Sequence, residues 1–262
     1  MEQLDRIIEK LKLNRDVDAM LITGSLGVGK SKPYSDIDLV VILKENKNSL
    51  YSLYKWIGGI FAEIFFFDMS DIQRINTSKN IDSDNFDAIL LDWVKKSNIY
   101  FDKSGVTTYL KSKSSEIDIS LVSEKSKNGY CQRINHNYIT DKRYFESGDK
   151  IYHESLEMKL FYSMEQIICG YFALRDISWR GEKNAILYMK ENAKDFYKMF
   201  QDYTSATSLI ERFKAYSHMV ELVFTKEYKK WTTDTEIILK KDFSVADEKD
   251  SASIYVKSLF QE

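Results

Sequence analysis

The sequence predicts an α+β fold in which a small mixed β-sheet flanked by helices is followed by a C-terminal helical bundle. Three apolar runs, 18–23, 36–43 and 61–68, are rich in β-branched or aromatic residues and too short for buried helices. In the second half of the chain, apolar residues such as Leu156 and Leu160 recur instead at helical spacing. This change of period favours a sheet-containing part and a separate helical part.

The elements of the first part follow from periodicity and turn residues. Leu4, Ile8 and Leu11 lie at helical spacing, so residues 2–13 are expected to form an amphipathic helix. Residues 49–60 are expected to form a second helix that ends at Gly58-Gly59. Further predicted elements are a helix at 84–97 with Phe86, Ile89, Leu90 and Trp93 inward, a strand and turn at 98–105, and a helical turn at 106–113.

The second part is expected to be a helical bundle over residues 123–230. Its two apolar faces are traced by Leu156, Leu160, Phe161, Met164, Ile167, Ile168 and Tyr171, and by Leu209, Phe213, Tyr216, Val220 and Val223. The serine- and lysine-rich segment 111–115 predicts a boundary that divides the chain into residues 1–115 and 116–262. The highly charged last thirty residues predict a mixed helix and tail.

Composition excludes several classes of protein. The formal net charge of −2 offers no basic excess for a long nucleic acid. The two cysteines stand far apart and the three histidines lack metal-ligand spacing, which argues against zinc and a disulfide framework. The charged N-terminus has no signal-peptide core, and no run approaches eighteen apolar residues, so a soluble cytoplasmic protein without membrane contact is expected.

Asp36 and Asp38 begin the second predicted strand, and alternation places both carboxylates on one face. Two like charges at close range repel each other unless a cation lies between them. Mg²⁺ prefers one or two carboxylates together with substrate phosphates, so the pair predicts a divalent metal site. An isolated Asp-x-Asp is usually only solvated, and the similar stretch 116–118, which no glycine loop precedes, is assigned no function.

Gly24-Ser25 distinguishes the first pair, because it ends the preceding apolar run. A strand that ends in Gly-Ser and continues into a short helical turn presents backbone N–H groups and a hydroxyl to an anion. A phosphate cradle would then face the metal carboxylates.

Gly24-Ser25, ten further residues and Asp36-Ile37-Asp38-Leu39 together resemble the signature of the DNA polymerase β nucleotidyltransferase superfamily. Within it, the chain looks most similar to bacterial small-molecule nucleotidyltransferases that inactivate aminoglycosides or lincosamides. The resemblance implies Mg²⁺ or Mn²⁺ and ATP or another nucleoside triphosphate as co-substrate. It also implies nucleotide contacts from Gly24, Ser25, Ser35 and Lys183.

The family places a third metal carboxylate on a neighbouring strand in a hydrophobic-acid-hydrophobic pattern, which Ala62-Glu63-Ile64 matches. A carboxylate within a run of aromatic residues is costly unless it is paired or bound to metal. Asp68 is the alternative, but parity places it on the other strand face, where it would act as a helix N-cap or loop residue. The predicted catalytic and metal-binding set is therefore Asp36, Asp38 and Glu63.

A P-loop motif overlaps the same stretch. Residues 24–31, GSLGVGKS, fit G-x-x-x-x-G-K-[ST], which would place Lys30 on phosphates. A P-loop requires a long helix that opens at Lys30, whereas Pro33 follows closely and a strand begins near Asp36. The sequence therefore favours the nucleotidyltransferase interpretation.

The resemblance implies transfer of AMP from ATP to a hydroxyl of a small molecule such as an antibiotic, in a monomer or homodimer. Residues 1–115 would then be the catalytic domain and residues 116–262 a helical substrate-binding domain. Candidates for the general base are Glu63, Glu154, Glu157 and Glu165. Transfer to a protein or tRNA in a toxin–antitoxin pair, and a non-catalytic nucleotide-binding module, stay open as alternatives.

Overall fold

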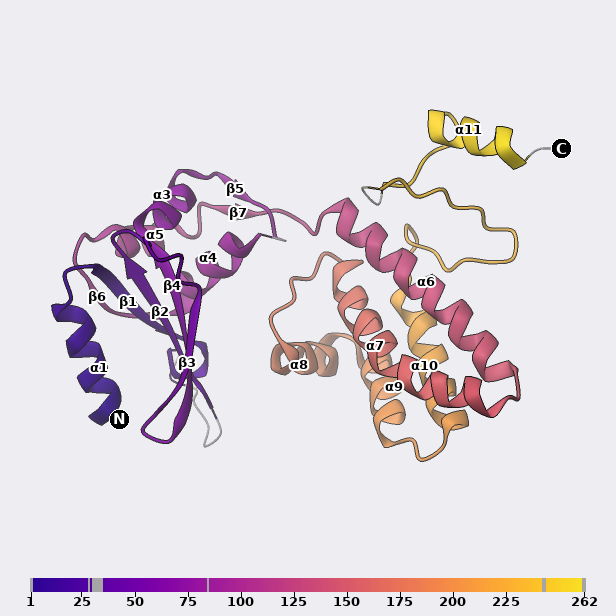
Figure 1. Cartoon of the computed structure of the whole chain (residues 1–262), viewed down its shortest axis with the longest axis horizontal. Coiled ribbons are helices and arrows are strands. Elements are labelled where there is room, and N and C mark those ends of the chain that lie inside the picture. Colours follow the sequence, from indigo (N-terminus) through magenta and orange to yellow (C-terminus); the bar gives the residue numbers. More distant parts are fainter. Residues whose placement is uncertain (1, 28, 30–34, 84, 242–243, 261–262) are drawn as a thin grey trace. The chain divides into compact units, whose positions relative to one another are not determined.

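The computed structural model describes residues 2–27, 29, 35–83, 85–241 and 244–260. The chain forms two compact units, Met1–Ser120 and Leu121–Glu262. The first unit holds the strands and the second is helical (Figure 1). The protein is therefore α+β, as the sequence predicts.

A five-stranded sheet organises the first unit, with the strand order β3-β4-β2-β1-β6. Its strands are β1 (Val17–Thr23), β2 (Ile37–Leu43), β3 (Ser52–Ile57), β4 (Ile60–Asp68) and β6 (Asn98–Asp102). β2 and β4 run parallel, whereas the other three pairings are antiparallel. The mixed sheet results because β3 and β4 form a hairpin that adds to the open edge of β2.

Helices cover both faces of this sheet because alternate strand residues are apolar on both sides. Leu4 and Ile8 of α1 (Glu2–Leu13) pack on one face against residues such as Leu39. The other face packs against α3 (Met69–Thr77), α4 (Phe86–Lys96) and α5 (Val106–Lys113). The remaining elements are the one-turn α2 (Gly24–Gly27) and a small parallel pair, β5 (Asn80–Ile81) with β7 (Asp118–Ile119).

The helix predicted at 49–60 is wrong, because the structure has a β-hairpin there. Gly58 and Gly59 have φ values of 58° and 81° and form a two-residue turn between β3 and β4. Such a turn needs positive φ at both central residues, which Gly-Gly supplies without strain. Tyr54 and Trp56 alternate with Leu53 and Lys55 along β3, a pattern typical of strands.

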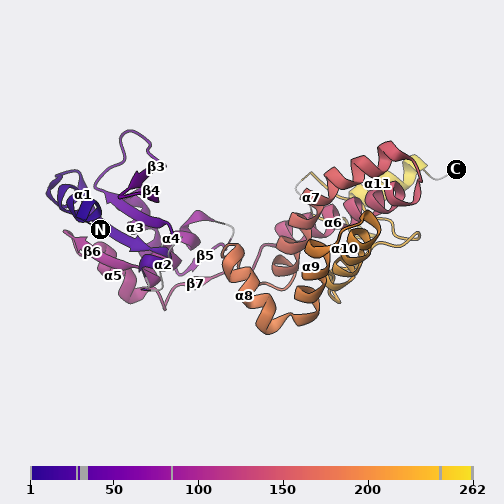
Figure 2. The ribbon, with the colours of Figure 1, turned by 90° about the horizontal axis from the view of Figure 1, so that it is seen from below.

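The second unit contains α6 (Glu124–Glu146), α7 (Lys150–Ala173), α8 (Glu182–Asn192), α9 (Lys194–Ser205), α10 (Leu209–Val223) and α11 (Ser251–Phe260). Figures 1 and 2 show α6, α7, α9 and α10 side by side. Their buried residues, among them Leu160, Phe196 and Tyr216, form one core. Among the described residues, no helix is long and apolar enough to cross a membrane.

Two predicted core residues are exposed instead. Phe161 of α7 is 79% exposed and Ile89 of α4 is 43% exposed. Each directly adjoins a fully buried neighbour, Leu160 and Leu90 respectively. Adjacent helix residues lie about 100° apart around the helix axis, so the packed stripe is narrower than the apolar pattern predicts.

Candidate active site

The chain leaves β1 through a tight turn that requires glycine at two positions. Gly24, the first residue of α2, has a φ of 62°, which side-chain-bearing residues rarely adopt. At Gly27, a Cβ atom would lie 2.2 Å from the carbonyl oxygen of Ile22. The close approach of α2 to the end of β1 therefore depends on both glycines.

The carboxylate of Asp38 lies against this turn. A Cβ atom at Gly24 would come within 1.8 Å of Oδ2 of Asp38 and 2.9 Å of its Cγ. The register explains the contact, because Asp38 of β2 pairs with Thr23, the residue directly before Gly24. The structure thus brings Gly24 and Asp38 together at the end of β1.

Asp38 is also paired with Glu63. The two residues are direct partners in the parallel pairing of β2 with β4, so their side chains lie on the same sheet face. Neighbouring strands lie about 4.8 Å apart. Tyr54 of β3 is the partner of Glu63 on the other side. A row of four residues, Thr23, Asp38, Glu63 and Tyr54, therefore crosses the sheet on one face.

Asp36 and Ser35 lie just before β2, and both are half-buried. Asp36 is thus close in sequence to the row but outside the paired part of the strand. Within the described residues, no three or more His, Cys, Asp and Glu side chains lie close enough together to hold a metal ion. Asp36, Asp38 and Glu63 therefore stay a prediction as a three-carboxylate set.

Ser25 supplies a second polar group beside Gly24. Its Oγ is buried and has no hydrogen-bond partner among the described residues. A buried hydroxyl without a partner costs free energy, about 1–3 kcal/mol. A ligand oxygen at this position would satisfy it, which is consistent with the predicted phosphate contact.

The donor set fits a nucleotide-bound divalent cation. Asp38 and Glu63 offer two hard carboxylate oxygen donors on adjacent strands, which is the number that Mg²⁺ usually takes beside substrate phosphates. Such an ion would polarise the α-phosphate and offset its developing charge. These two carboxylates would hold it, with Asp36 as the third predicted ligand.

Asp68 lies on the face of β4 opposite Glu63. It has the structural role of a helix N-cap, as the sequence analysis expects if it is not a metal ligand. It is the N-cap of α3, where Oδ1 accepts hydrogen bonds from the backbone N–H groups of Ser70 and Asp71. Burial raises the pKa of the Asp68 carboxyl, but hydrogen bonds from Ser70, Asn46 and Asp71 outweigh it, so the net pKa is lowered.

The other predicted residues are less constrained. Lys183 lies exposed in the first turn of α8, in the second unit. Glu154 pairs with Lys150 and Glu157 with Arg212, and Glu165 is exposed. The structure therefore adds no support for any of these glutamates as a base.

The P-loop interpretation depends on Lys30, which lies outside the described residues. Its confirming feature would be a long helix that opens there. Because β2 already begins at Ile37, the chain has no room for one.

Sequence reasoning missed that three exposed aromatic residues lie in this row or beside it. Tyr54, Trp56 and Phe61 are exposed, and they share the sheet face of Glu63 because Tyr54 pairs with Glu63 and Trp56 with Phe61. The helix expected at 49–60 placed Tyr54 and Trp56 outside the sheet, so their pairing with β4 beside Phe61 was not predicted. The Gly58-Gly59 dipeptide between two apolar runs was the signal for a hairpin.

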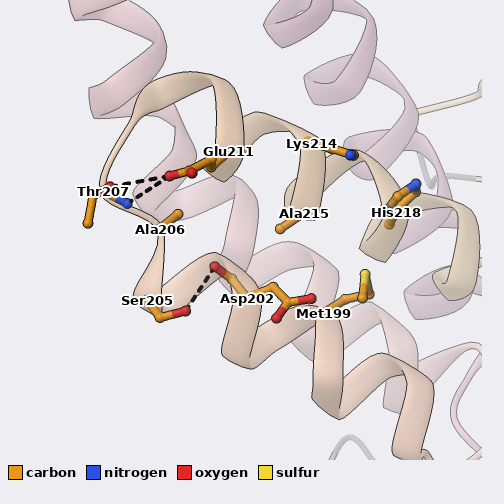
Figure 3. Close-up of a pocket in the computed structure, with 9 residues that line it drawn as sticks. All are labelled: Met199, Asp202, Ser205, Ala206, Thr207, Glu211, Lys214, Ala215 and His218. Atoms are coloured by element: carbon orange, nitrogen blue, oxygen red, sulfur yellow. Dashed lines mark hydrogen bonds between the residues drawn. The ribbon is translucent and has the colours of Figure 1, made fainter.

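The second unit has a hollow of its own between α9 and α10, with a volume of about 510 Å³ (Figure 3). Thr207 and Glu211 lie at one end, where the Glu211 carboxylate accepts hydrogen bonds from the Thr207 backbone and hydroxyl. Met199 and His218 line the opposite end. Glu211 belongs to the capping box of α10 and so has a structural role, and we assign the hollow no catalytic role.

A glycine turn at the end of β1 that faces carboxylates of the neighbouring strands defines a candidate phosphate- and metal-binding domain. Residues 5–85 match the sequence model of the family described as "Polymerase beta, Nucleotidyltransferase". The matched stretch includes Gly24, Asp38 and Glu63, and it confirms the resemblance to the DNA polymerase β-like superfamily that the sequence shows.

A solved structure is also similar to the chain. The crystal structure of a nucleotidyltransferase-like protein from Exiguobacterium sibiricum 255-15 shares 13% sequence identity, and the match covers 85% of this chain and 73% of that one with a TM-score of 0.40. No curated protein matches the chain.

Proposed function

We propose that the protein is a metal-dependent nucleotidyltransferase that moves AMP from ATP to a hydroxyl group of a small molecule. The observation that carries this proposal is the juxtaposition of Gly24, Asp38 and Glu63. It places a tight glycine turn, suited to phosphate, beside two carboxylates suited to a divalent cation. An aminoglycoside or lincosamide is the proposed acceptor class, following the sequence resemblance.

The reaction would join the acceptor oxygen to the α-phosphorus and break the bond between that phosphorus and the oxygen that leads to the β-phosphate. Pyrophosphate would leave toward Gly24 and Ser25. Backbone N–H groups and the buried Ser25 hydroxyl would donate hydrogen bonds to it there. A bound divalent cation would stabilise the charge on the transferred group. Glu63 lies on the site face and is the candidate to accept the hydroxyl proton.

A labelling experiment tests the proposal. The protein is incubated with ATP labelled at the α-phosphate, Mg²⁺ and a panel of aminoglycosides, lincosamides, tRNA and cell lysate. We expect label on a small molecule, and more than about a hundredfold loss of transfer in Asp38→Asn. Asp118→Asn is the matched control, because Asp118 belongs to a similar sequence pattern but lies exposed in β7.

Label on tRNA or protein alone would contradict the small-molecule acceptor. Transfer that Asp38→Asn leaves unchanged at saturating Mg²⁺ would contradict the assigned site.

A further inference from the structure

Three exposed aromatic side chains form a continuous surface on the β3–β4 hairpin. The rings of Tyr54 and Phe61 are stacked with centroids 6.2 Å apart, and the Trp56 ring meets Phe61 edge-on at 5.6 Å. Trp56 is 67% exposed and Tyr54 is 54% exposed. We call these three residues the aromatic platform.

The platform begins where the helical cover of the sheet ends. On the same face of β4, Phe65 packs against Trp93 with centroids 4.9 Å apart, and Phe67 is buried against Phe86. Glu63 follows toward the hairpin turn and is only half-buried, and Phe61 is exposed. The uncovered aromatic surface is therefore continuous with the carboxylate row.

The order of strands determines which substrate can reach the platform. β1, β2, β4 and β3 are successive neighbours, so Gly24 at the end of β1, Asp38, Glu63 and Tyr54 follow one another across the sheet. In nucleotidyl transfer, the attacking and leaving oxygens lie on opposite sides of the phosphorus. If pyrophosphate leaves toward Gly24 and Ser25, the acceptor approaches from the side of Glu63 and the platform.

Charge further restricts the acceptor. Glu63 adjoins the platform and Asp38 lies beside Glu63, and the faces of aromatic rings also attract positive charge. Among the described residues of β3 and β4, Lys55 is the only basic one. It pairs with Ala62 and therefore lies on the opposite sheet face. This surface favours neutral or cationic rings and disfavours phosphorylated or acidic ones.

We infer that the aromatic platform of Tyr54, Trp56 and Phe61 is the acceptor-binding surface, and that it takes a neutral or cationic molecule with a flat, apolar ring face that carries the reacting hydroxyl. This inference rests on the proposed function, because the direction of approach follows from nucleotidyl transfer. It places acceptor recognition in the first unit of the chain.

Calorimetric titration tests the inference with four probes: kanamycin with cationic rings, lincomycin with one amine, neutral adenosine and anionic glucuronate. Each is titrated in the presence of Mg²⁺ and a non-hydrolysable ATP analogue, so that no transfer occurs. The variants are Trp56→Ala and Tyr54→Ala. Tyr100→Ala is the matched control, because Tyr100 is 45% exposed on β6, the opposite edge strand of the same sheet.

We expect at least one neutral or cationic probe to bind the parent. Trp56→Ala and Tyr54→Ala should weaken that binding by roughly 5- to 150-fold, the range found for loss of one stacking ring. Tyr100→Ala should leave it unchanged, and all three variants should keep the parent's affinity for the ATP analogue.

Three outcomes would overturn the inference. One is weaker binding of the ATP analogue with unchanged probe binding, which would make the platform a nucleobase site. Another is a parent that binds only glucuronate or none of the probes. The third is conversion of a parent dimer to a monomer by Trp56→Ala, in sedimentation, with unchanged probe binding. Failure of the proposed function gives a different result. The parent and Asp38→Asn would then bind the magnesium nucleotide with equal affinity.

Discussion

Asp38 occupies the space that a side chain on Gly24 would need, since a Cβ atom there would lie 1.8 Å from Oδ2 of Asp38. The glycine of the Gly-Ser pair therefore has two functions. It permits the positive φ of the turn, and it lets a carboxylate approach the start of α2.

Gly24→Ala is expected to impair both stability and nucleotide binding. The positive φ costs a side-chain-bearing residue about 1–2 kcal/mol, so the free energy of unfolding should fall by that amount. Asp38 must also move, so the affinity for magnesium-ATP should fall by more than about tenfold. Urea denaturation and calorimetric titration measure the two effects.

Gly148→Ala is the control for Gly24→Ala. Gly148 has a similar φ of 68°, but an added Cβ atom there would meet nothing within 4 Å. It should lose stability to a similar degree and keep its nucleotide affinity. Equal nucleotide affinity in both variants would show that the Gly24–Asp38 contact is irrelevant to binding.

The paired carboxylates predict a metal-linked gain in stability. Asp38 and Glu63 lie side by side on adjacent strands, so without a cation their charges repel. Magnesium-ATP at a hundred times its Kd should stabilise the parent by about 2.7 kcal/mol. Asp38→Asn and Glu63→Gln should each lose this gain in thermal denaturation.

Asp36→Asn tests the remaining predicted ligand in the same assay. If Asp36 completes the metal site, its variant should behave like Asp38→Asn, whereas Asp118→Asn should retain the full gain. A full gain in Asp36→Asn would restrict the site to Asp38 and Glu63.

Local signals in the sequence were sufficient for most of the first unit. The short apolar runs gave β1, β2 and β4 to within a residue or so, and parity along β4 separated the faces of Glu63 and Asp68. The pairing of Asp38 with Glu63 could not be derived from periodicity. It depends on the parallel alignment of two strands that are far apart in the sequence.

The error at 49–60 has a physical cause. Leu50, Leu53 and Ile57 lie at a spacing that helices also show, so the apolar pattern is ambiguous in a short window. The structure exposes Leu53 on β3, which is an edge strand, and it also exposes Leu50 just before that strand. The apolar pattern of 49–60 therefore does not distinguish a helix from a strand. The Gly58-Gly59 turn is the feature that does.

Asp68 predicts a pH-dependent contribution to stability. Asp68→Ala removes the N-cap of α3 and should lower the free energy of unfolding by about 1 kcal/mol at neutral pH. The folded-state pKa of Asp68 is lowered, so its ionised form stabilises the fold. The contribution is complete above the unfolded-state pKa and is lost as the pH falls through the folded-state pKa.

Urea denaturation of parent and Asp68→Ala at neutral and strongly acidic pH measures this contribution. The difference between the two proteins should shrink in acid. Nucleotide binding should stay unchanged, because Asp68 lies on the sheet face opposite Glu63. Loss of magnesium-ATP binding in Asp68→Ala would show that the wrong carboxylate of β4 was assigned to the site.

The core of the second unit predicts the opposite pH dependence. Asp141 is fully buried, and it accepts hydrogen bonds from the hydroxyl groups of Tyr216 at 2.7 Å and Ser163 at 3.0 Å. Burial raises the pKa of the Asp141 carboxyl, and the hydroxyl donors and Lys159, 3.5 Å away, offset this only in part. Tyr216→Phe leaves Asp141 with one donor fewer and should cost about 1–3 kcal/mol.

Because the folded-state pKa of Asp141 lies above its unfolded-state value, the native protein binds more protons between the two values. Its contribution to stability should therefore decrease as the pH rises from about 4, the unfolded-state pKa, through the raised pKa. Asp141→Asn should remove this decrease, and Lys159→Met should extend it to higher pH, because it removes the cation that favours the charged form. Urea denaturation from pH 4 to pH 8 compares the three proteins, with Asp118→Asn as an exposed control. A parent and an Asp141→Asn variant with parallel stability curves over that range would show that Asp141 titrates no differently in the folded and unfolded states.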